Sequence, residues 1–300
     1  MTDHRETIDM TETVPALVDR IRAHIEARFA PATIDERPFP HLIIEDFFPA
    51  DVYDRLVAGN PFRRNAGSVW RDAADASNVT ARTPYQARRQ INFHADEPFD
   101  APPDDRAFWD AIRDVFLADD WFPGLIFAKA PEYFRHRFGN LMDDPGVARH
   151  FRRELFLQRH EPGFHIGPHT DIPTRVFTCI FSLPRETGWE RFGTELLEPD
   201  DPLVRCWGND HHPVEGFHVS KLAPYRPNNF LLFLKTRHSF HSVACTDESV
   251  PDQRYGMQFQ FYEPAGGLFT DLSAPDLMTV RHRPGAARRS LRAMLGWRRG

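Results

Sequence analysis

Hydrophobic residues in the first part of the chain recur at helical spacing. Between residues 14 and 29 the apolar positions fall three and four residues apart, with charged residues between them, which predicts an amphipathic helix. The same spacing predicts a helix over residues 105–119, and Pro49 and Gly59 mark the start and the end of another one. The segment HLIIEDFF before Pro49 is predicted to be a strand. Residues 60–105 are polar and rich in proline and arginine, which is typical of a long functional loop.

From about residue 150 onward, the pattern changes to short apolar or alternating runs separated by turn residues. Such runs are typical of β-strands. They cover residues 153–160, 174–183, 193–199, 228–235 and 255–263. Several short strands with turns between them indicate a barrel or a sandwich of sheets, and the earlier helices are expected to pack outside it. The predicted fold class is therefore mainly β with flanking helices.

The length and composition are those of a single globular domain. The chain has 300 residues, of which 41% are hydrophobic and 27% charged, and it can bury a core without disulfide or metal staples. We predict a disordered N-terminus over residues 1–12, one domain over residues 13–270 with its β core from about residue 150, and a basic tail over residues 271–300. Residues 281–300 carry seven arginines and no acid. They are either a solvated tail or an anchor for an anionic surface.

Charge and cysteine content exclude several classes of protein. The net charge is −6, so the chain is not built to coat nucleic acid. Three cysteines without a CxxC pair exclude a zinc knuckle and are typical of a reducing compartment. No apolar run approaches the ~18 residues of a membrane helix, and the N-terminus shows no apolar signal segment. We therefore expect a cytoplasmic protein, and nothing in the sequence indicates its oligomeric state.

The segment HIGPHTDIP, residues 165–173, contains candidate metal ligands. His165 and His169 are four residues apart, as two ligands on a helix would be, but the glycine and proline between them disfavour a helix. His169 and Asp171 are two residues apart, so on an extended segment both side chains point the same way. With a second histidine from elsewhere, they would form the two-histidine, one-carboxylate set of non-haem Fe(II) oxygenases.

A second histidine is expected beyond the end of another buried strand. The apolar run Phe230–Leu234 predicts such a strand, and His238 and His241 follow it closely. Residues three apart on a strand face opposite sides, so at most one of these two histidines can be the ligand. The hydrophobic pattern alone leaves both candidates open.

Three motifs follow one another in the second half of the chain. His169-Thr-Asp171 is an HxD motif, SFHSV surrounds His241, and the segment QRYGMQFQFY contains Arg254 as its second residue. Together they resemble the metal-binding and co-substrate-binding motifs of the Fe(II)- and 2-oxoglutarate-dependent oxygenase superfamily. PFPHLIIEDFF and GTEL resemble segments of its bacterial prolyl-hydroxylase-like branch, and the resemblance covers roughly residues 38–265.

This resemblance implies a double-stranded β-helix core, also called a jelly roll or cupin-like core. It implies Fe(II) held by His169, Asp171 and His241, 2-oxoglutarate paired with Arg254, and ascorbate as the reductant. With O2, the co-substrate would yield succinate and CO2 while an unactivated C–H bond of the substrate is hydroxylated. Related halogenases replace the carboxylate with a small residue, so Asp171 favours hydroxylation over halogenation. Desaturation and ring closure stay open.

Further residues near the motifs are candidates for the pocket. Many members of the superfamily carry a serine two residues after the arginine, and here Gly256 stands at that place. The hydroxyl of Tyr255, that of Thr178 or another one would replace it. Gln158 is a candidate contact of 2-oxoglutarate. Arg175 and His165 are candidate contacts of the substrate.

Other histidines and other functions are also considered. His160 is a candidate for the pocket lining. His211, His212 and His218 are interpreted as solvent-facing residues or parts of a lid. The substrate is predicted to be a small or amino-acid-like molecule, free or carrier-bound. A cupin-like binding protein without turnover and a zinc-dependent hydrolase with the same three ligands are the alternatives.

Overall fold

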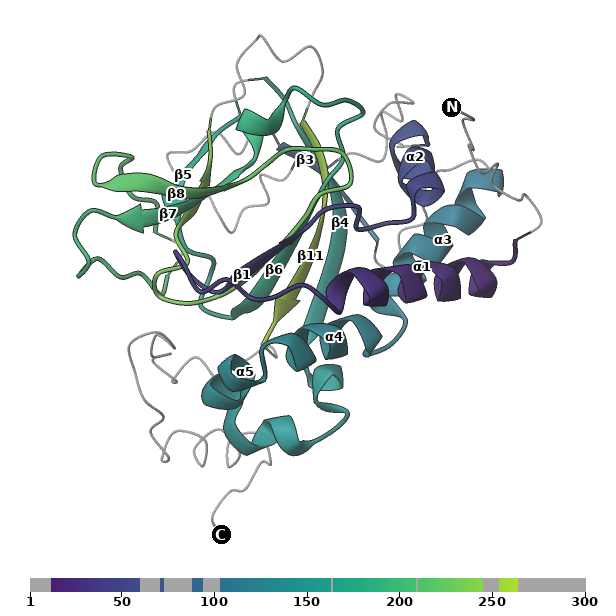
Figure 1. Ribbon diagram of the computed structural model, residues 1–300, viewed down its shortest axis with the longest axis horizontal. Coiled ribbons are helices and arrows are strands. Elements are labelled where there is room, and N and C mark those ends of the chain that lie inside the picture. Colours follow the sequence, from purple (N-terminus) through teal and green to yellow (C-terminus); the bar gives the residue numbers. More distant parts are fainter. Residues whose placement is uncertain are drawn as a thin grey trace.

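The computed structural model describes residues 12–59, 71–72, 88–93, 103–162, 164–208, 210–244 and 254–263. Two antiparallel sheets lie opposite each other, and helices pack beside the larger one (Figure 1). The predicted disorder up to residue 11, the basic tail and most of the 60–105 loop fall outside the described residues. Within the described part, no helix has the length and hydropathy to cross a membrane.

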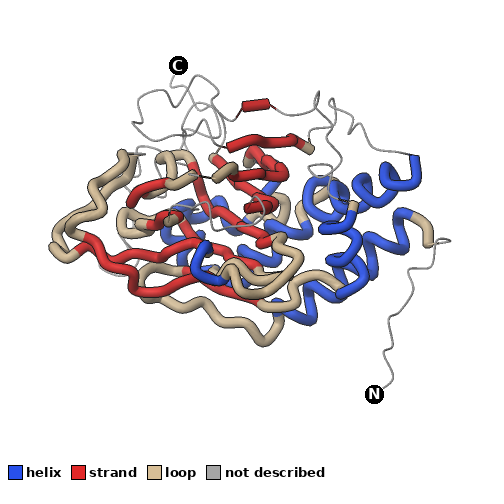
Figure 2. The backbone as a smooth tube through the Cα atoms, turned by 90° about the horizontal axis from the view of Figure 1, so that it is seen from above, coloured by secondary structure: helices blue, strands red, loops and turns tan. Residues whose placement is uncertain are grey.

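The helices pack on the outer face of the larger sheet (Figure 2). Their bounds in the described part of the chain are α1 (Val14–Phe29), α2 (Ala50–Ala58), α3 (Pro103–Leu117), α4 (Trp121–Lys129) and α5 (Pro131–Phe138). Short 3-10 helices cover Gly139–Asp143, Val147–His150 and Glu190–Phe192. α1 and α3 lie where the apolar spacing predicts them, and α2 lies between Pro49 and Gly59 as predicted. The spacing does not reveal α4, because its sequence WFPGLIFAK is apolar on nearly every side.

The strands form a seven-stranded and a four-stranded sheet. In spatial order, the large sheet contains β1 (His41–Ile44), β9 (Phe230–Leu234), β6 (Arg175–Ser182), β11 (Arg254–Tyr262), β4 (Arg152–His160), β3 (Arg88–Asn92) and β2 (Arg71–Asp72). The small sheet contains β5 (Ile166–His169), β10 (His241–Val243), β7 (Thr194–Pro199) and β8 (Phe217–Ala223).

The order of the strands is that of a jelly roll. When β4 is counted as the first of the last eight strands, the large sheet contains them in the order 1-8-3-6 and the small sheet in the order 2-7-4-5. Successive strands therefore alternate between the two sheets, except that β7 and β8 both lie in the small sheet, which is the double Greek-key arrangement of this fold. The predicted double-stranded β-helix core is confirmed.

β2 and β3 lie within the 60–105 segment, where the sequence predicts a loop, and β8 is not among the predicted strands. β3 pairs with β2 and β4, and β8 pairs with β7. The β3 sequence RRQIN is largely polar, and β8 is an edge strand on which only Ala223 is buried. Their pairing with neighbouring strands, rather than their own hydrophobic pattern, determines their conformation.

Side-chain alternation along β11 separates the core from the site. Met257, Phe259 and Phe261 are fully buried in the cluster that joins the large sheet to the helices. Gln258 and Gln260 point to the opposite face, where they line a cavity between the two sheets. The strand thus has an apolar outer face that anchors it and a polar inner face that is available for binding.

Candidate metal centre and pocket

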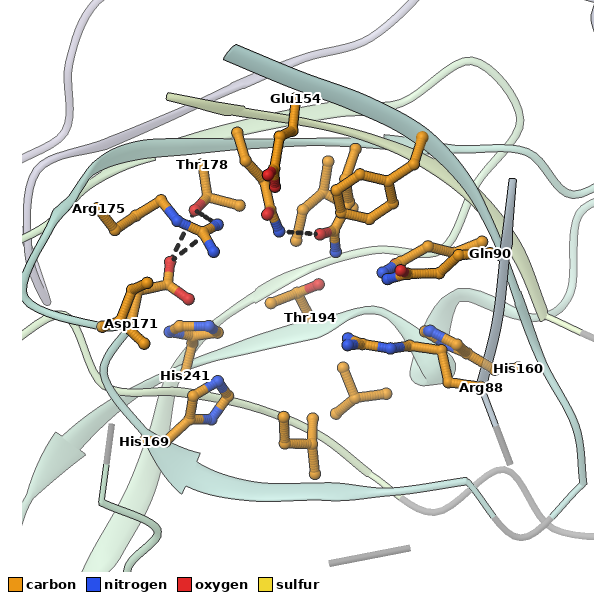
Figure 3. Close-up of a pocket in the computed structure, with 18 of the residues that line it drawn as sticks. Arg88, Gln90, Glu154, His160, His169, Asp171, Arg175, Thr178, Thr194 and His241 are labelled. Carbon is orange, nitrogen blue, oxygen red and sulfur yellow. Dashed lines mark hydrogen bonds and ion pairs between the residues drawn. The ribbon is translucent and has the colours of Figure 1, made fainter. Parts of the chain in front are cut away.

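Three side chains that are distant in the sequence converge at one end of the small sheet. His169 is the last residue of β5, Asp171 follows two residues later, and His241 begins β10. The two strands pair antiparallel, with His241 directly opposite His169. One ligand atom from each of the three side chains lies within 4.8 Å of the others (Figure 3). The hydrophobic pattern leaves His238 and His241 open, the family resemblance points to His241, and the structure places His241 in the cluster.

Hydrogen bonds orient both imidazoles for coordination. The Nδ1 atom of His169 lies 2.9 Å from the carbonyl oxygen of Gly167, and that of His241 lies 3.0 Å from the carbonyl oxygen of Ser239. A carbonyl can only accept, so each Nδ1 carries the proton and each Nε2 keeps a free electron pair. Burial lowers the pKa of both imidazoles, which keeps them neutral. This is the state in which histidine binds a metal.

Asp171 completes the donor set as a carboxylate. Burial by itself would raise its pKa, but Arg175, His241 and His169 lower it, and the hydrogen bond from Thr178 lowers it further. The net effect holds the pKa well below the usual range, so the group remains ionised. Two neutral imidazole nitrogens and one carboxylate oxygen fit a divalent transition metal such as Fe(II).

Arg254 lies at the other end of the cavity and has no acidic partner among the described residues. Only 6% of it is exposed. Its Nε donates to the carbonyl oxygen of Phe192 at 2.8 Å, and one of its terminal nitrogens donates to Nδ1 of His160 at 2.9 Å. Burial lowers the pKa of Arg254, and burial together with the nearby arginines lowers that of His160. A buried guanidinium without a carboxylate is costly unless a ligand supplies the anion.

Arg254, His160 and Arg88 form a row across three neighbouring strands. His160 on β4 is paired with Arg254 on β11 and with Arg88 on β3. The Nε2 atom of His160 and the carboxamide nitrogen of Gln158 are both buried without a hydrogen-bond partner in the described part of the chain. Because Nδ1 of His160 accepts a hydrogen bond, its Nε2 carries a proton, so both unsatisfied groups are donors. This end of the cavity therefore favours an anionic, acceptor-rich ligand.

A cavity of about 570 Å³ connects the metal ligands to Arg254. Among its lining residues are most of the predicted site residues: His169, Asp171, His241, Arg254, Gln158, Thr178 and Arg175. His160 also lines it. His165 is exposed and is not among the described residues that line the cavity.

The structure separates the three histidines of the 200–220 segment. The ring of His211 stacks on that of His169, with centroids 4.8 Å apart. His212 packs against Phe240. His218 lies on β8, where it is exposed and forms an ion pair with Asp200. Only His211 therefore touches the metal-binding cluster.

Sequence reasoning does not identify several residues of the lining. Arg152, Glu154 and Tyr262 line the cavity beside Arg175. Residues 152, 154, 156, 158 and 160 alternate along β4 and all line the cavity. The two-residue period of this strand, counted from Gln158, is the signal that would have found Glu154 and Arg152.

Comparisons with known proteins give structural likenesses at low identity. No protein-family model and no curated protein sequence matches the chain. A prolyl-4-hydroxylase from Pseudomonas putida is 16% identical, with a TM-score of 0.43, over 81% of this chain and 99% of that one. The 2-oxoglutarate-dependent epimerase SnoN from nogalamycin biosynthesis is 14% identical, with a TM-score of 0.41, over 89% of this chain and 92% of that one. HygX from Streptomyces hygroscopicus, solved with nickel and 2-oxoglutarate, is 13% identical, with a TM-score of 0.41, over 74% and 82%. The assignment of the site therefore rests on the geometry of this chain.

Proposed function

We propose that the protein is an Fe(II)- and 2-oxoglutarate-dependent oxygenase that hydroxylates a small or amino-acid-like molecule. One observation carries the proposal. The His169, Asp171 and His241 cluster lies on the walls of the same cavity as the buried Arg254, which has no acidic partner among the residues that the structure describes. The cluster provides a metal site with open positions, and Arg254 provides the cation that a dicarboxylate requires at its far end.

Different residues would bind the metal and 2-oxoglutarate. His169, Asp171 and His241 would hold Fe(II), which with 2-oxoglutarate and O2 supplies the oxidising chemistry. Arg254 would pair with the distal carboxylate of 2-oxoglutarate, and Gln158 would donate to the same ligand from the neighbouring strand. The hydroxyl proton of Thr178 is already donated to Asp171. Thr178 can therefore contact 2-oxoglutarate only as an acceptor, and its main role is to hold Asp171.

The proposed reaction converts substrate, 2-oxoglutarate and O2 into hydroxylated substrate, succinate and CO2, with ascorbate as the reductant that maintains Fe(II). One oxygen atom enters the new hydroxyl group and the other enters succinate. The carboxylate of Asp171 fills the position that a halide would need, which supports hydroxylation over halogenation. Nine of the 23 described lining residues are arginines or carboxamides, including Arg175, Gln90 and Gln258, and they favour a polar substrate.

A spectroscopic titration tests this function. Fe(II) and 2-oxoglutarate added without oxygen are expected to produce a weak visible charge-transfer band that His169→Ala abolishes. A screen of amino acids, acyl conjugates and sugars should then identify a substrate by coupled O2 consumption and succinate release. Small-molecule binding without a band would support a cupin-like binding protein, and hydrolysis with Zn(II) but no O2 uptake would support a hydrolase. Either result would refute the oxygenase.

A further inference from the structure

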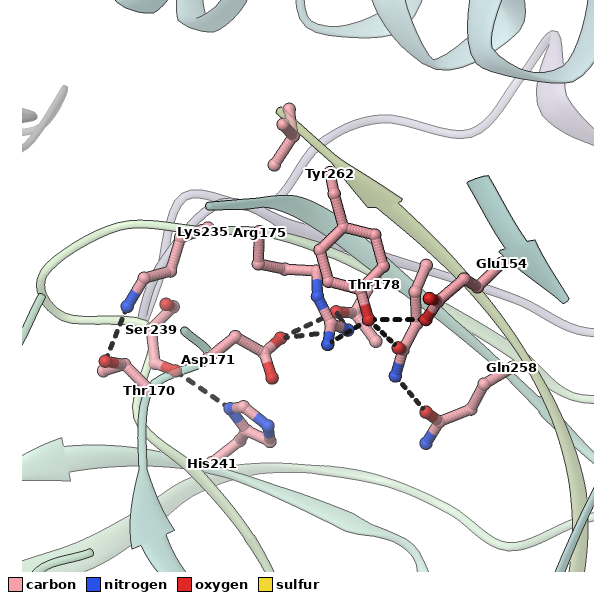
Figure 4. Close-up of polar contacts among 12 residues, drawn as sticks. Glu154, Thr170, Asp171, Arg175, Thr178, Lys235, Ser239, His241, Gln258 and Tyr262 are labelled. Carbon is pink, nitrogen blue, oxygen red and sulfur yellow. Dashed lines mark hydrogen bonds and ion pairs between the residues drawn. The ribbon is translucent and has the colours of Figure 1, made fainter. Parts of the chain in front are cut away.

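The two oxygens of Asp171 have different surroundings. Oδ2 accepts a hydrogen bond from the hydroxyl of Thr178 at 2.7 Å and lies 3.9 Å from a terminal nitrogen of Arg175. The other oxygen points toward His241 (Figures 3 and 4). One oxygen is therefore held by the protein, and the other faces the proposed metal position.

Arg175 is held in place from several directions. It is 7% exposed, and it donates to the hydroxyl oxygen of Thr178 at 3.1 Å and to the phenol oxygen of Tyr262 at 2.9 Å. Its guanidinium carbon also lies 4.3 Å from the centroid of the Tyr262 ring. The hydroxyl of Tyr262 in turn lies 2.8 Å from a carboxylate oxygen of Glu154 (Figure 4), and it also contacts the carboxamide oxygen of Gln260.

The direction of these hydrogen bonds follows from the groups involved. A guanidinium can only donate, and each hydroxyl has a single proton. Thr178 accepts from Arg175 and donates its proton to Asp171. Tyr262 also accepts from Arg175, and two acceptors, Glu154 and Gln260, face its single proton. The chain from Arg175 through Thr178 therefore ends on a carboxylate and keeps Oδ2 of Asp171 from turning.

We propose that Arg175 is a positioning residue that, with Thr178, restricts Asp171 to one coordinating oxygen. The inference rests on the proposed metal site but not on the identity of the co-substrate. With one oxygen from Asp171 and one nitrogen from each histidine, about three of six positions stay open, which is what chelation of a 2-oxo acid and binding of O2 require. Coordination by both oxygens of Asp171 would occupy one of those positions.

Co(II) spectroscopy tests the inference without turnover. In Arg175→Met, the released oxygen is expected to join the metal, so the visible absorption of the Co(II)-loaded protein should change in the absence of 2-oxoglutarate. The dissociation constant of 2-oxoglutarate from that protein should rise about tenfold, as is usual when a partner of a metal ligand is lost. Thr178→Val removes a hydrogen bond but no charge, and it should shift the Co(II) spectrum in the same direction.

Arg152 provides a matched control. Its guanidinium carbon lies 4.0 Å from the centroid of the same Tyr262 ring, but within the described part of the chain no hydrogen bond or ion pair joins it to Asp171. Arg152→Met should therefore leave the Co(II) spectrum unchanged. Unchanged spectra in both Arg175→Met and Thr178→Val, or an equal change in Arg152→Met, would overturn the inference. If the wild-type protein binds Co(II) but not 2-oxoglutarate, the proposed function fails while the spectral comparison still decides the role of Arg175.

Discussion

His169 and His241 are direct cross-strand neighbours in the small sheet, with ring centroids 4.2 Å apart. Two neutral histidines lie this close together with an ionised aspartate beside them. A divalent cation bound among them would offset the free-energy cost of burying the carboxylate. The backbone carbonyls of Gly167 and Ser239 fix both rings, so the cluster is organised before a metal arrives. Binding should therefore need little rearrangement.

Replacement of a single ligand should abolish tight metal binding. We expect His241→Ala to weaken Co(II) binding by at least about 100-fold, because even the partners of metal ligands contribute about 10- to 100-fold. His238→Ala is the matched control, since it removes a histidine three residues away that is outside the cluster. Equilibrium titration followed by Co(II) absorption provides the measurement. Equal affinities in the two variants would show that the three side chains do not form the site.

Arg254→Met should weaken 2-oxoglutarate binding without lowering the stability of the protein. Loss of the guanidinium should weaken 2-oxoglutarate binding by at least about 30-fold, since truncation of one partner of a buried charge pair costs about 2 kcal/mol or more. Metal binding should remain. The unfolding free energy of the metal-free protein should not fall and should rise by up to about 2 kcal/mol, because the variant no longer buries an unpaired charge.

A neighbouring arginine distinguishes this effect from a general loss of positive charge. Arg159 follows Gln158 on β4, lies outside the described lining of the cavity, and pairs with Glu161 at 2.6 Å. Arg159→Met should leave 2-oxoglutarate affinity within about twofold of wild type. Calorimetric titration and urea unfolding measure both quantities. A stable Arg254→Met protein with wild-type affinity for 2-oxoglutarate would assign the co-substrate to another part of the cavity.

Local pattern in the sequence predicts the parts of the fold that have one apolar face. The alternation along residues 255–263 reflects a strand between a phenylalanine-rich core and a polar cavity. The HxD spacing is also a local pattern. It predicts that His169 and Asp171 point the same way because residues two apart lie on one side of an extended segment. β3 and β8 have no such pattern, and only their partners reveal them.

Long-range register explains what the sequence does not predict at the site. His160 faces Arg254 and Arg88 because two separate strands pair with β4 at the same residue. Arg175 could have formed a surface ion pair, and only the folded sheet shows that it reaches both Thr178 and Tyr262. Such contacts depend on how strands from different parts of the chain align, and neither composition nor spacing encodes that alignment locally.

The buried Lys235 should make the stability of the protein depend on pH. It is 1% exposed, and its ammonium group donates at 2.6 Å to Thr170, which lies between the proposed metal ligands His169 and Asp171. Burial, more than any other effect, lowers its pKa to about 7. Below pH 7 both the folded and the unfolded chain carry the proton, and the full cost of burying the charge is present. Between about pH 7 and the usual lysine value near 10.4, only the unfolded chain binds the proton, so this group makes the unfolding free energy rise with pH.

Lys235→Met should remove this dependence. At pH 6.5 we expect the variant to be more stable than wild type by about 4 kcal/mol, given about 1.4 kcal/mol per pKa unit less about 1 kcal/mol for the lost hydrogen bond. By pH 9.5 most of the difference should disappear. Urea unfolding at the two pH values provides the test, with the half-exposed Lys221, paired with Asp35, replaced by methionine as the control. A difference that does not vary with pH would mean that Lys235 keeps an ordinary pKa.

Gly193 lies where β7 begins, and the end of β8 leaves no room for a side chain. A Cβ atom at this position would lie 2.0 Å from the carbonyl oxygen of Ala223 and 3.0 Å from Cα of Pro224. Both neighbours are backbone atoms, so the strands themselves would have to separate. The preceding residue, Phe192, supplies the carbonyl that holds Arg254, so this close approach also supports the co-substrate end of the cavity.

Gly193→Ala should therefore reduce both stability and 2-oxoglutarate binding. We expect the unfolding free energy to fall by about 1–3 kcal/mol, the usual cost of forcing extra atoms into a packed site. Gly124→Ala is the contrasting variant, because nothing lies within 4 Å of its added Cβ in α4, and it should raise stability by about 0.5–1 kcal/mol. Thermal unfolding and calorimetric titration with 2-oxoglutarate measure the two effects. If Gly193→Ala were as stable as wild type, the close approach of β7 and β8 would not exist in solution. That approach could then not support the contact between Phe192 and Arg254.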